Sequence, residues 1–323
     1  MRRYIAVEEA FTIPELAARQ PKIQARIRNK PSFAREWALM LPDIANYRIP
    51  EMDAHGVDIQ VLSLSVPGIQ IDSEKEMAVA NAEFANNYLA DVIDRHPDRF
   101  RGFVALPLQD PARAIIELER CVANLGFCGA LVNDHTRGAY LDHPDFDDVW
   151  SALEELDVPL YIHPGSNPLD DWAVMSNRPE MYGASWSWQA EVGGHAMRLI
   201  YGGIFDRHPK ATLILGHLGE FLPFQQSRFD SRYQTLSVQF PLQHAPSEYF
   251  KRNIKITTSG ILAPQAIEAA VNVIGADSIM FAVDYPYERT SEAVAALDTS
   301  TLSDSDKNKI AHENARRVLR LAI

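Results

Sequence analysis

The chain has 323 residues, with 31 Lys and Arg against 43 Asp and Glu, so its formal net charge is −12. Nucleic acids and anionic membranes select basic surfaces, and the excess of acids argues against either as the main partner. An apolar content of 46% excludes a disordered chain.

Short apolar runs recur along the chain, and most are followed by a segment with helical periodicity. This alternation predicts parallel strands that are buried on both faces and joined by helices. The predicted strands are 4–7, 59–64, 100–106, 129–132, 159–163, 212–216, 254–257 and 278–282. The predicted helices are 74–95, 111–124, 146–156, 189–201, 264–273 and 304–321.

Eight strand–helix units favour a closed (β/α)8 barrel of the TIM type over a doubly wound sheet. No G-x-G-x-x-G turn follows a predicted strand, so the best marker of the doubly wound alternative is missing. Two long connections, about 12–42 and 164–188, leave the ends of strands, where barrel loops build active sites. Because no linker of biased composition divides the chain, we expect residues 1–323 to form one α/β domain with these two insertions.

The cysteines and the first residues bear on the cellular compartment. Cys121 and Cys128 are too few for a disulfide framework, and residues 1–9 do not resemble a signal peptide. No apolar run approaches the roughly 20 residues that span a bilayer. We therefore expect a cytoplasmic protein.

The ten histidines differ in position. Most lie in polar loops or helical patterns, and His96 and His208 each close a helix in an Asp-Arg-His-Pro sequence. His163 and His217 instead end apolar strands, at the C-terminal tips that form the catalytic face of a barrel. These two are the candidate functional histidines.

Two carboxylates satisfy the same criterion. Glu8 follows the first predicted strand and Asp284 follows the eighth, and these strands become neighbours when a barrel closes. The two histidines and the two carboxylates would then lie together at the C-terminal mouth of the barrel. Carboxylate and imidazole ligands without a thiolate suit Zn²⁺, Mn²⁺ or a similar divalent ion.

Five short stretches carry a more specific resemblance: residues 8–11 (EEAF), 161–164 (YIHP), 215–220 (LGHLGE), 256–260 (ITTSG) and 281–286 (FAVDYP). They resemble the amidohydrolase superfamily. More narrowly, they are similar to its metal-dependent hydroxybenzoate decarboxylases, the branch of 2,3-dihydroxybenzoate and gamma-resorcylate decarboxylases, related to aminocarboxymuconate semialdehyde decarboxylase. The similarity covers essentially the whole chain and is specific for the branch, less so for the substrate.

The resemblance implies one divalent metal ion, Zn²⁺, Mn²⁺ or Mg²⁺, held by Glu8, His163 and Asp284, and no organic cofactor. His217 is implied to lie beside the ion, hydrogen-bonded to the substrate or to Glu220, three residues later. A small aromatic carboxylate is the implied substrate, and a homodimer or homotetramer the implied assembly.

The implied reaction is non-oxidative decarboxylation of an ortho-hydroxybenzoate-type acid, or the reverse carboxylation of a phenol. Nothing stabilises a phenyl carbanion well at neutral pH, so we predict that the ring carbon bearing the carboxylate is protonated before CO₂ leaves. Binding of the phenolate and one carboxylate oxygen to the metal would hold the ring. Asp284 is the predicted proton donor. His217, kept protonated by Glu220, is the alternative.

Four residues near the strand ends are expected to contact the ring or its substituents: Ala10, Phe11, Asn133 and Tyr285. Arg228 resembles an arginine that in related enzymes reaches the carboxylate site of a neighbouring subunit. A surface ion pair with Asp230 is the alternative for Arg228.

The residue at position 10 distinguishes a decarboxylase from a binuclear hydrolase. Many members of the superfamily carry a histidine at this position, whereas alanine cannot ligate and leaves room for substrate or water. A metal-dependent hydrolase of a lactone or amide is the alternative function, and the missing ligand disfavours the second metal of a binuclear hydrolase. A non-catalytic barrel, which would bind no metal, is a further alternative. The particular acid, the metal and the direction of the reaction stay open.

Overall fold

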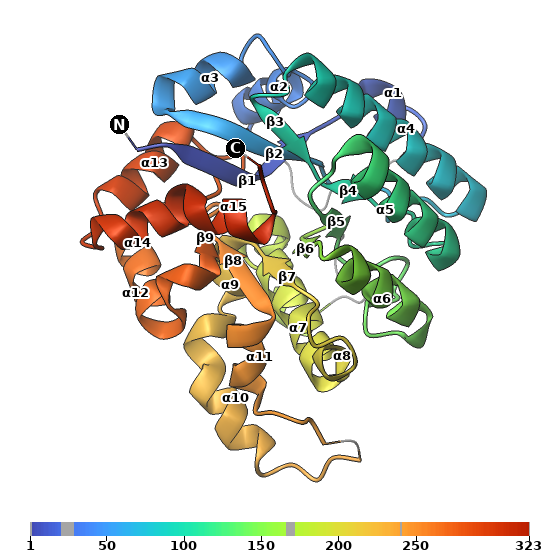
Figure 1. Ribbon diagram of the computed structural model, residues 1–323, viewed down its shortest axis with the longest axis vertical. Helices are drawn as coiled ribbons and strands as arrows, with labels where there is room; N and C mark the ends of the chain where they lie inside the picture. The colour runs from blue at the N-terminus through green and yellow to red at the C-terminus, as the bar shows by residue number, and fades with distance from the viewer. Residues whose placement is uncertain (1, 21–28, 166–171, 240, 323) are drawn as a thin grey trace.

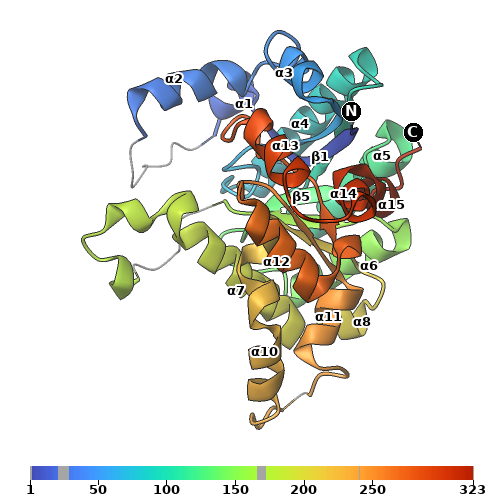
Figure 2. The ribbon, with the colours of Figure 1, turned by 90° about the vertical axis from the view of Figure 1, so that its left-hand side faces the viewer.

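A computed structural model of the protein describes residues 2–20, 29–165, 172–239 and 241–322. Residues 21–28 and 166–171, which belong to the two predicted insertions, lie outside the described residues. The described parts of these insertions contain short helices rather than open loops. Figure 2 shows α2 and the segment that precedes α7 projecting on the same side of the molecule.

Parallel strands form the centre of the molecule (Figure 1), in two sheets with the orders β1-β2-β3 and β4-β5-β6-β7-β8-β9. The strands are β1 (Tyr4–Phe11), β2 (Val57–Leu64), β3 (Phe100–Gly102), β4 (Val104–Ala105), β5 (Ala130–Asn133), β6 (Leu160–His163), β7 (Leu213–Leu215), β8 (Ile254–Thr257) and β9 (Ile279–Met280). The predicted strand 100–106 is therefore divided into β3 and β4.

Backbone hydrogen bonds join the two sheets at both seams. The amide of Phe103, between β3 and β4, donates to the Leu62 carbonyl at 3.0 Å. At the other seam the Asp284 amide donates to the Glu8 carbonyl at 3.1 Å, and Glu9 forms a parallel bridge with Tyr285. These bonds close the ring of strands, so the predicted (β/α)8 barrel is confirmed.

Helices surround the strands (Figure 1). Those in the first half are α1 (Pro14–Ala17), α2 (Pro31–Met40), α3 (Arg48–His55), α4 (Lys75–Arg95), α5 (Pro111–Leu125) and α6 (Asp147–Leu156). Those in the second half are α7 (Ser187–Tyr201), α8 (Ile204–Arg207), α9 (His217–Glu220), α10 (Gln226–Tyr233), α11 (Pro246–Arg252), α12 (Pro264–Ile274), α13 (Thr290–Asp298), α14 (Asp304–Asn308) and α15 (Asn314–Val318). No helix of the described ranges is both long enough and apolar enough to cross a membrane.

An extra residue in β1 sets which side chains face the barrel mouth. Ala6 pairs with Gln60 and Glu9 pairs with Leu62, so three steps along β1 match two along β2. Such a bulge breaks the strict alternation of faces along a strand. As a result Glu8 reaches across the barrel while Glu9 turns into its wall, although both are buried.

Candidate active site

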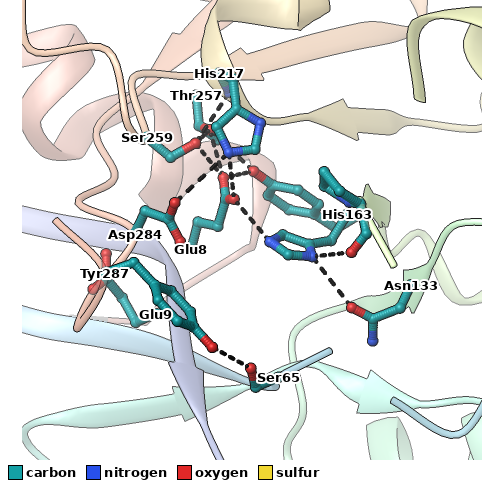
Figure 3. Close-up of polar contacts among 12 residues, drawn as sticks. Glu8, Glu9, Ser65, Asn133, His163, His217, Thr257, Ser259, Asp284 and Tyr287 are labelled. Atoms are coloured by element: carbon teal, nitrogen blue, oxygen red, sulfur yellow. Dashed lines mark hydrogen bonds and ion pairs between the residues drawn. The ribbon is translucent and has the colours of Figure 1, made fainter. Parts of the chain in front are cut away.

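The structure brings the four predicted residues of the strand tips together (Figure 3). Glu8 lies on β1, His163 ends β6, His217 follows β7 and Asp284 follows β9. Glu8 Oε1 lies 3.4 Å from the Nε2 atoms of both His163 and His217. The Nε2 atom of His217 also lies 3.8 Å from Asp284 Oδ2. All four therefore share one site at the C-terminal ends of the strands.

Three hydroxyl groups hold the other oxygen of Glu8. Tyr161 and Ser259 donate hydrogen bonds to Glu8 Oε2, and Thr257 Oγ1 donates to it at 3.1 Å. Glu8 Oε1, by contrast, is buried and has no hydrogen-bond partner among the described residues. The carboxylate is thus fixed by one oxygen and leaves the other available to a cation.

The tautomers of both histidines follow from their partners. Nδ1 of His163 faces two acceptors, the Pro164 carbonyl at 2.6 Å and Asn133 Oδ1 at 3.2 Å, so it carries the proton. Nδ1 of His217 donates in the same way to Glu220 Oε1 at 2.7 Å. Each Nε2 is therefore directed at Glu8 Oε1. A nitrogen lone pair facing a carboxylate oxygen is repulsive unless a cation or a proton lies between them, and this arrangement is typical of metal-ligating histidines.

The geometry fits one divalent ion. Glu8, His217 and Asp284 each offer a ligand atom, and these three atoms lie within 4.8 Å of one another. This group contains His217 in place of His163, which the sequence predicted as a ligand together with Glu8 and Asp284. The Nε2 atom of His163 nevertheless lies as close to Glu8 Oε1 as that of His217, at 3.4 Å. Oxygen and imidazole donors of this kind suit Zn²⁺ or Mn²⁺.

Electrostatics favour a protonated His217. Burial lowers the pKa of the His217 imidazole, but the carboxylates of Glu220 and Glu8 and the hydrogen bond to Asp284 raise it well above its ordinary value. Burial raises the pKa of Glu8, and the two histidines together with the Ser259 and Tyr161 hydroxyls outweigh it, so that the pKa is lowered. Both shifts favour an ionised Glu8 beside a protonated His217, and a cation bound at His217 Nε2 would take the place of that proton.

A left-handed turn places His217 and Glu220 face to face. All five residues from His217 to Phe221 have positive φ, between 49° and 74°, and only Gly219 is a glycine. Left-handed residues normally occur singly, because the Cβ atom crowds the following carbonyl. The turn brings Nδ1 of His217 against Glu220 although the two residues are only three apart in sequence.

Glu9 occupies a separate site in the barrel wall. Its carboxylate accepts hydrogen bonds from the amides of Val283 at 2.9 Å and Tyr285 at 3.3 Å, and from Gln60 Nε2 at 3.3 Å. Gln60 in turn accepts a bond from the fully buried Arg48 at 3.0 Å. Burial raises the pKa of the Glu9 carboxyl to about 8, against the amides and Arg48, which lower it.

The predicted substrate residues lie at different depths. Asn133 is at the mouth, where its Nδ2 donates to the Leu64 carbonyl at 3.4 Å and its Oδ1 faces His163. Ala10 is partly exposed, whereas Phe11 is buried and stacks on Tyr88 with ring centroids 6.1 Å apart. Tyr285 is 1% exposed, and the Arg48 guanidinium covers its ring at 4.4 Å. The substrate contacts of these residues stay predictions.

Arg228 is exposed on α10, which projects from the barrel (Figure 1). Asp230, the alternative partner considered for it, accepts a hydrogen bond from the Ser247 amide at 2.9 Å. Among the described residues no ion pair joins Arg228 to Asp230. The predicted role of Arg228 in a neighbouring subunit stays a prediction.

A second group of titratable side chains, Asp134, His135 and Glu191, also brings its potential ligand atoms within 4.8 Å of one another. The Gly138 amide donates to His135 Nδ1 at 3.1 Å, which places the ring proton on Nε2. The neighbouring His195 uses both nitrogens, donating to Asp134 at 3.0 Å and accepting from the Leu141 amide at 2.9 Å. These bonds fix the loop after β5 and leave neither histidine with a free lone pair.

The residues that hold Glu8 had no role in the sequence-based prediction. Tyr161 lies two residues before His163, hence on the same face of β6, and this spacing is the signal that identifies it. Thr257 ends β8 and Ser259 lies two residues beyond it, positions equivalent to those of the predicted ligands. The positions of these residues at the strand ends could identify them, but hydroxyl side chains are common there and do not by themselves indicate a role.

A buried carboxylate that faces two histidines at the mouth of a parallel barrel defines a class of metal-dependent barrel enzymes. The amidohydrolase family model matches residues 14–321 of the chain. A gamma-resorcylate decarboxylase of Rhizobium radiobacter is 39% identical over 331 residues, which cover 99% of both chains. The chain belongs to the amidohydrolase family, as its motifs predicted.

Solved structures give the same result. A 2,6-dihydroxybenzoate decarboxylase in complex with 2,6-dihydroxybenzoate superposes with a TM-score of 0.92 at 38% identity, covering 99% of this chain and 100% of that one. A dihydroxybenzoic acid decarboxylase of Polaromonas sp. JS666, with bound manganese and the inhibitor 2-nitroresorcinol, has a TM-score of 0.91 at 36% identity and covers 100% of this chain and 98% of that one.

Proposed function

We propose that this protein is a divalent-metal-dependent, non-oxidative decarboxylase of ortho-hydroxybenzoate-type acids. One observation carries the proposal: the Nε2 atoms of His163 and His217 both lie 3.4 Å from a buried Glu8 oxygen that has no hydrogen-bond partner among the described residues. The relatives named as gamma-resorcylate and 2,6-dihydroxybenzoate decarboxylases support the same activity.

Glu8, His163 and Asp284 are the residues that would hold the ion. Glu8 and Asp284 belong to the group whose ligand atoms lie within 4.8 Å of one another, and His163 Nε2 lies 3.4 Å from Glu8 Oε1. These oxygen and nitrogen donors, and the manganese named in a related structure, support Mn²⁺ or Zn²⁺, with Mg²⁺ as a further candidate. When bound, a divalent ion supplies Lewis-acid stabilisation of negative charge worth several kcal/mol. Ala10, which cannot ligate, leaves space for the substrate beside these residues. The donor set requires no organic cofactor.

Asp284 delivers the proton in this proposal. Its carboxyl proton is transferred to the ring carbon that bears the substrate carboxylate; the bond from that carbon to the carboxylate then breaks, its electron pair restores the aromatic ring, and CO₂ leaves. His217 Nε2, 3.8 Å from Asp284 Oδ2, is placed to return a proton to Asp284. Glu220 supports this role because its charge helps to keep the imidazole protonated.

We also propose a cytoplasmic homodimer or homotetramer. Both cysteines are buried as free thiols, which suits a reducing compartment. Arg228 on the projecting α10 is exposed, so it can reach a neighbouring subunit as predicted. Sedimentation of the purified protein measures the assembly.

The test combines metal analysis with a panel of aromatic acids. The protein is expected to contain one divalent ion per chain and to release CO₂ from at least one ortho-hydroxybenzoate, while lactones and amides are not hydrolysed. Hydrolysis without decarboxylation would contradict the proposal.

Asp284→Asn tests the proton donor. The variant is expected to lose about 10² to 10⁴ in rate, the usual contribution of a general acid. Metal content must be measured in the same sample, and wild-type turnover with metal bound would assign the proton to His217 instead. Glu220→Gln is then the matched variant for the alternative donor.

A further inference from the structure

The C-terminal segment enters the seam of the barrel between β9 and β1. A π-helical turn, Lys309–Glu313, lies between α14 and α15 and contacts both strands, and Figure 1 shows α15 next to them. The carbonyl of Ile310 accepts a hydrogen bond from the Phe281 amide at 2.8 Å, and the Phe281 carbonyl accepts one from the Val7 amide at 3.1 Å. The turn thus gives the end of β9 a bond that a neighbouring strand normally supplies.

Single π-helical turns are rare and are frequently found at functional sites. In this turn Ile310 and Ala311 are both 0% exposed, so it is part of the packed interior. It contains none of the four residues that meet at the mouth. Any connection between the turn and the site therefore runs through β9.

Asn314, the first residue after the turn, fixes the beginning of β9. The residue is 2% exposed, and its Nδ2 donates to the carbonyls of Ala276 at 2.8 Å and Ile279 at 2.7 Å. Its Oδ1 accepts a hydrogen bond from Arg317 Nη2 at 3.0 Å. Both amide protons and the oxygen are engaged, so the side chain has one orientation.

The strand that Asn314 fixes leads to Asp284, which lies four residues after the end of β9. Asp284 has a φ of 75°, in the left-handed region that is strained for a residue other than glycine. Its amide donates to the Glu8 carbonyl at 3.1 Å. A strained residue keeps its place only where the surrounding structure fixes it, and the bonds from the C-terminal segment to Ile279 and Phe281 fix the chain just before Asp284.

We infer that Asn314, together with the π-helical turn, positions Asp284 at the mouth of the barrel. The inference rests on the proposed function, in which Asp284 helps to hold the ion and delivers the proton. Asn314 acts through the backbone of residues 279–284 and not through contact with the substrate. Because a displacement of about 1 Å at the reacting groups can cost about 10²-fold in rate, a residue far from the chemistry can control kcat.

Asn86 of α4 provides a matched control. It is 1% exposed; its Nδ2 donates to the Ala105 carbonyl at 3.1 Å and to Glu117 Oε1 at 2.7 Å, and its Oδ1 accepts from the Ala105 amide at 2.9 Å. It thereby fixes β4, whose end carries none of the four residues at the mouth. Asn86→Ala removes as many buried hydrogen bonds as Asn314→Ala, but on a strand that does not lead to Asp284.

The experiment compares both alanine variants with wild type by hydrogen–deuterium exchange, and by turnover of the Mn²⁺-loaded enzymes on the best substrate of the acid panel. Asn314→Ala is expected to speed exchange of the amides of residues 281–285 about tenfold, the value of one hydrogen bond. It is also expected to lower kcat about 10- to 100-fold with little change in KM. Asn86→Ala is expected to lose as much thermal stability, with wild-type kcat and wild-type exchange in residues 281–285.

Arg317→Ala is a milder variant of the same clamp. Arg317 is exposed, and its removal frees Asn314 Oδ1 while the two bonds from Asn314 to the backbone remain. It is expected to change exchange and kcat in the same direction by smaller factors. Arg316→Ala, which removes the neighbouring exposed arginine, is its control and is expected to change neither.

The inference is overturned if exchange of residues 281–285 in Asn314→Ala stays at the wild-type value, or if Asn86→Ala lowers kcat as much as Asn314→Ala. If Asn314→Ala does not fold, the comparison of Arg317→Ala with Arg316→Ala decides by the same two measurements. If none of the acids is decarboxylated, the proposed function fails, and exchange of residues 281–285 in the two asparagine variants decides the inference alone.

Discussion

Glu8 and Glu9 are the same residue type at consecutive positions of one strand, and both are buried, yet their surroundings differ. Glu8 has one oxygen fixed by hydroxyl groups and the other directed at two histidines. Glu9 has both oxygens engaged by backbone amides and by Gln60. A fully satisfied carboxylate stabilises a wall, whereas one that keeps an oxygen free can bind an ion.

Glu8→Gln is expected to have the largest effect, because it changes the carboxylate that faces the two histidines. An amide is a weak ligand and its NH₂ group would face the histidines, so the variant is expected to lose bound metal. Several kcal/mol of lost Lewis-acid stabilisation correspond to a fall in kcat of about 10³-fold or more. Elemental analysis and the decarboxylation assay measure both effects, with Glu9→Gln as the matched control that retains metal. Full metal occupancy in Glu8→Gln would contradict the assignment of Glu8.

Arg48→Ala tests the contacts that stabilise the barrel wall around Glu9 rather than the site at the mouth. The guanidinium donates to the Ala10 carbonyl at 2.6 Å and to Gln60, and it covers the Tyr285 ring. Its removal leaves the Ala10 carbonyl and the Gln60 amide oxygen without their donor and opens a cavity over the Tyr285 ring, which is expected to lower the free energy of unfolding by about 3 kcal/mol. Urea unfolding measures the change. A loss no larger than that of the exposed Arg113→Ala would refute the role of Arg48.

Added Mn²⁺ is expected to distinguish Glu8 from Glu9 through a smaller effect, a shift in thermal stability. An ion that binds only the folded protein stabilises it by about 2.7 kcal/mol at 100 times its Kd. Thermal unfolding of EDTA-treated protein is therefore expected to shift upward with Mn²⁺ in wild type and Glu9→Gln. No shift is expected in Glu8→Gln. An equal shift in all three proteins would place the ion elsewhere.

Ser259→Ala tests whether the hydroxyl groups around Glu8 Oε2 orient the carboxylate. It removes one of the three hydroxyls that fix Glu8 Oε2, so the free oxygen is less well oriented. Loss of such a supporting bond typically weakens metal binding by about 10- to 100-fold, and Mn²⁺ titration measures it. Ser300→Ala is the control, since Ser300 Oγ donates a local bond to the Leu297 carbonyl at 2.7 Å and is not part of the Glu8 site. Equal affinities in the two variants would show that the hydroxyls do not orient Glu8.

The sequence predicts the barrel and the four residues at the strand tips because apolar strands and the polar residues that end them are local patterns. The alternation of faces along a strand does not by itself explain why Glu8 rather than Glu9 faces the mouth, because the bulge in β1 arises from pairing with β2. Arg48 lies within α3, after the first insertion, and nothing in the local pattern shows that it is fully buried. The shared partners of Glu8 are likewise set by tertiary packing.

The turn from His217 to Phe221 has a consequence for laboratory evolution. Each of its four non-glycine residues in the left-handed region costs roughly 1 kcal/mol. The sum is large beside the 5–15 kcal/mol by which domains are typically stable. A screen for thermal stability alone would therefore enrich glycine at the exposed Phe221, whereas the buried Leu218 would lose more in core packing than the backbone gains. Such clones would survive heat and turn over substrate more slowly, because a relaxed turn holds His217 and Glu220 less firmly.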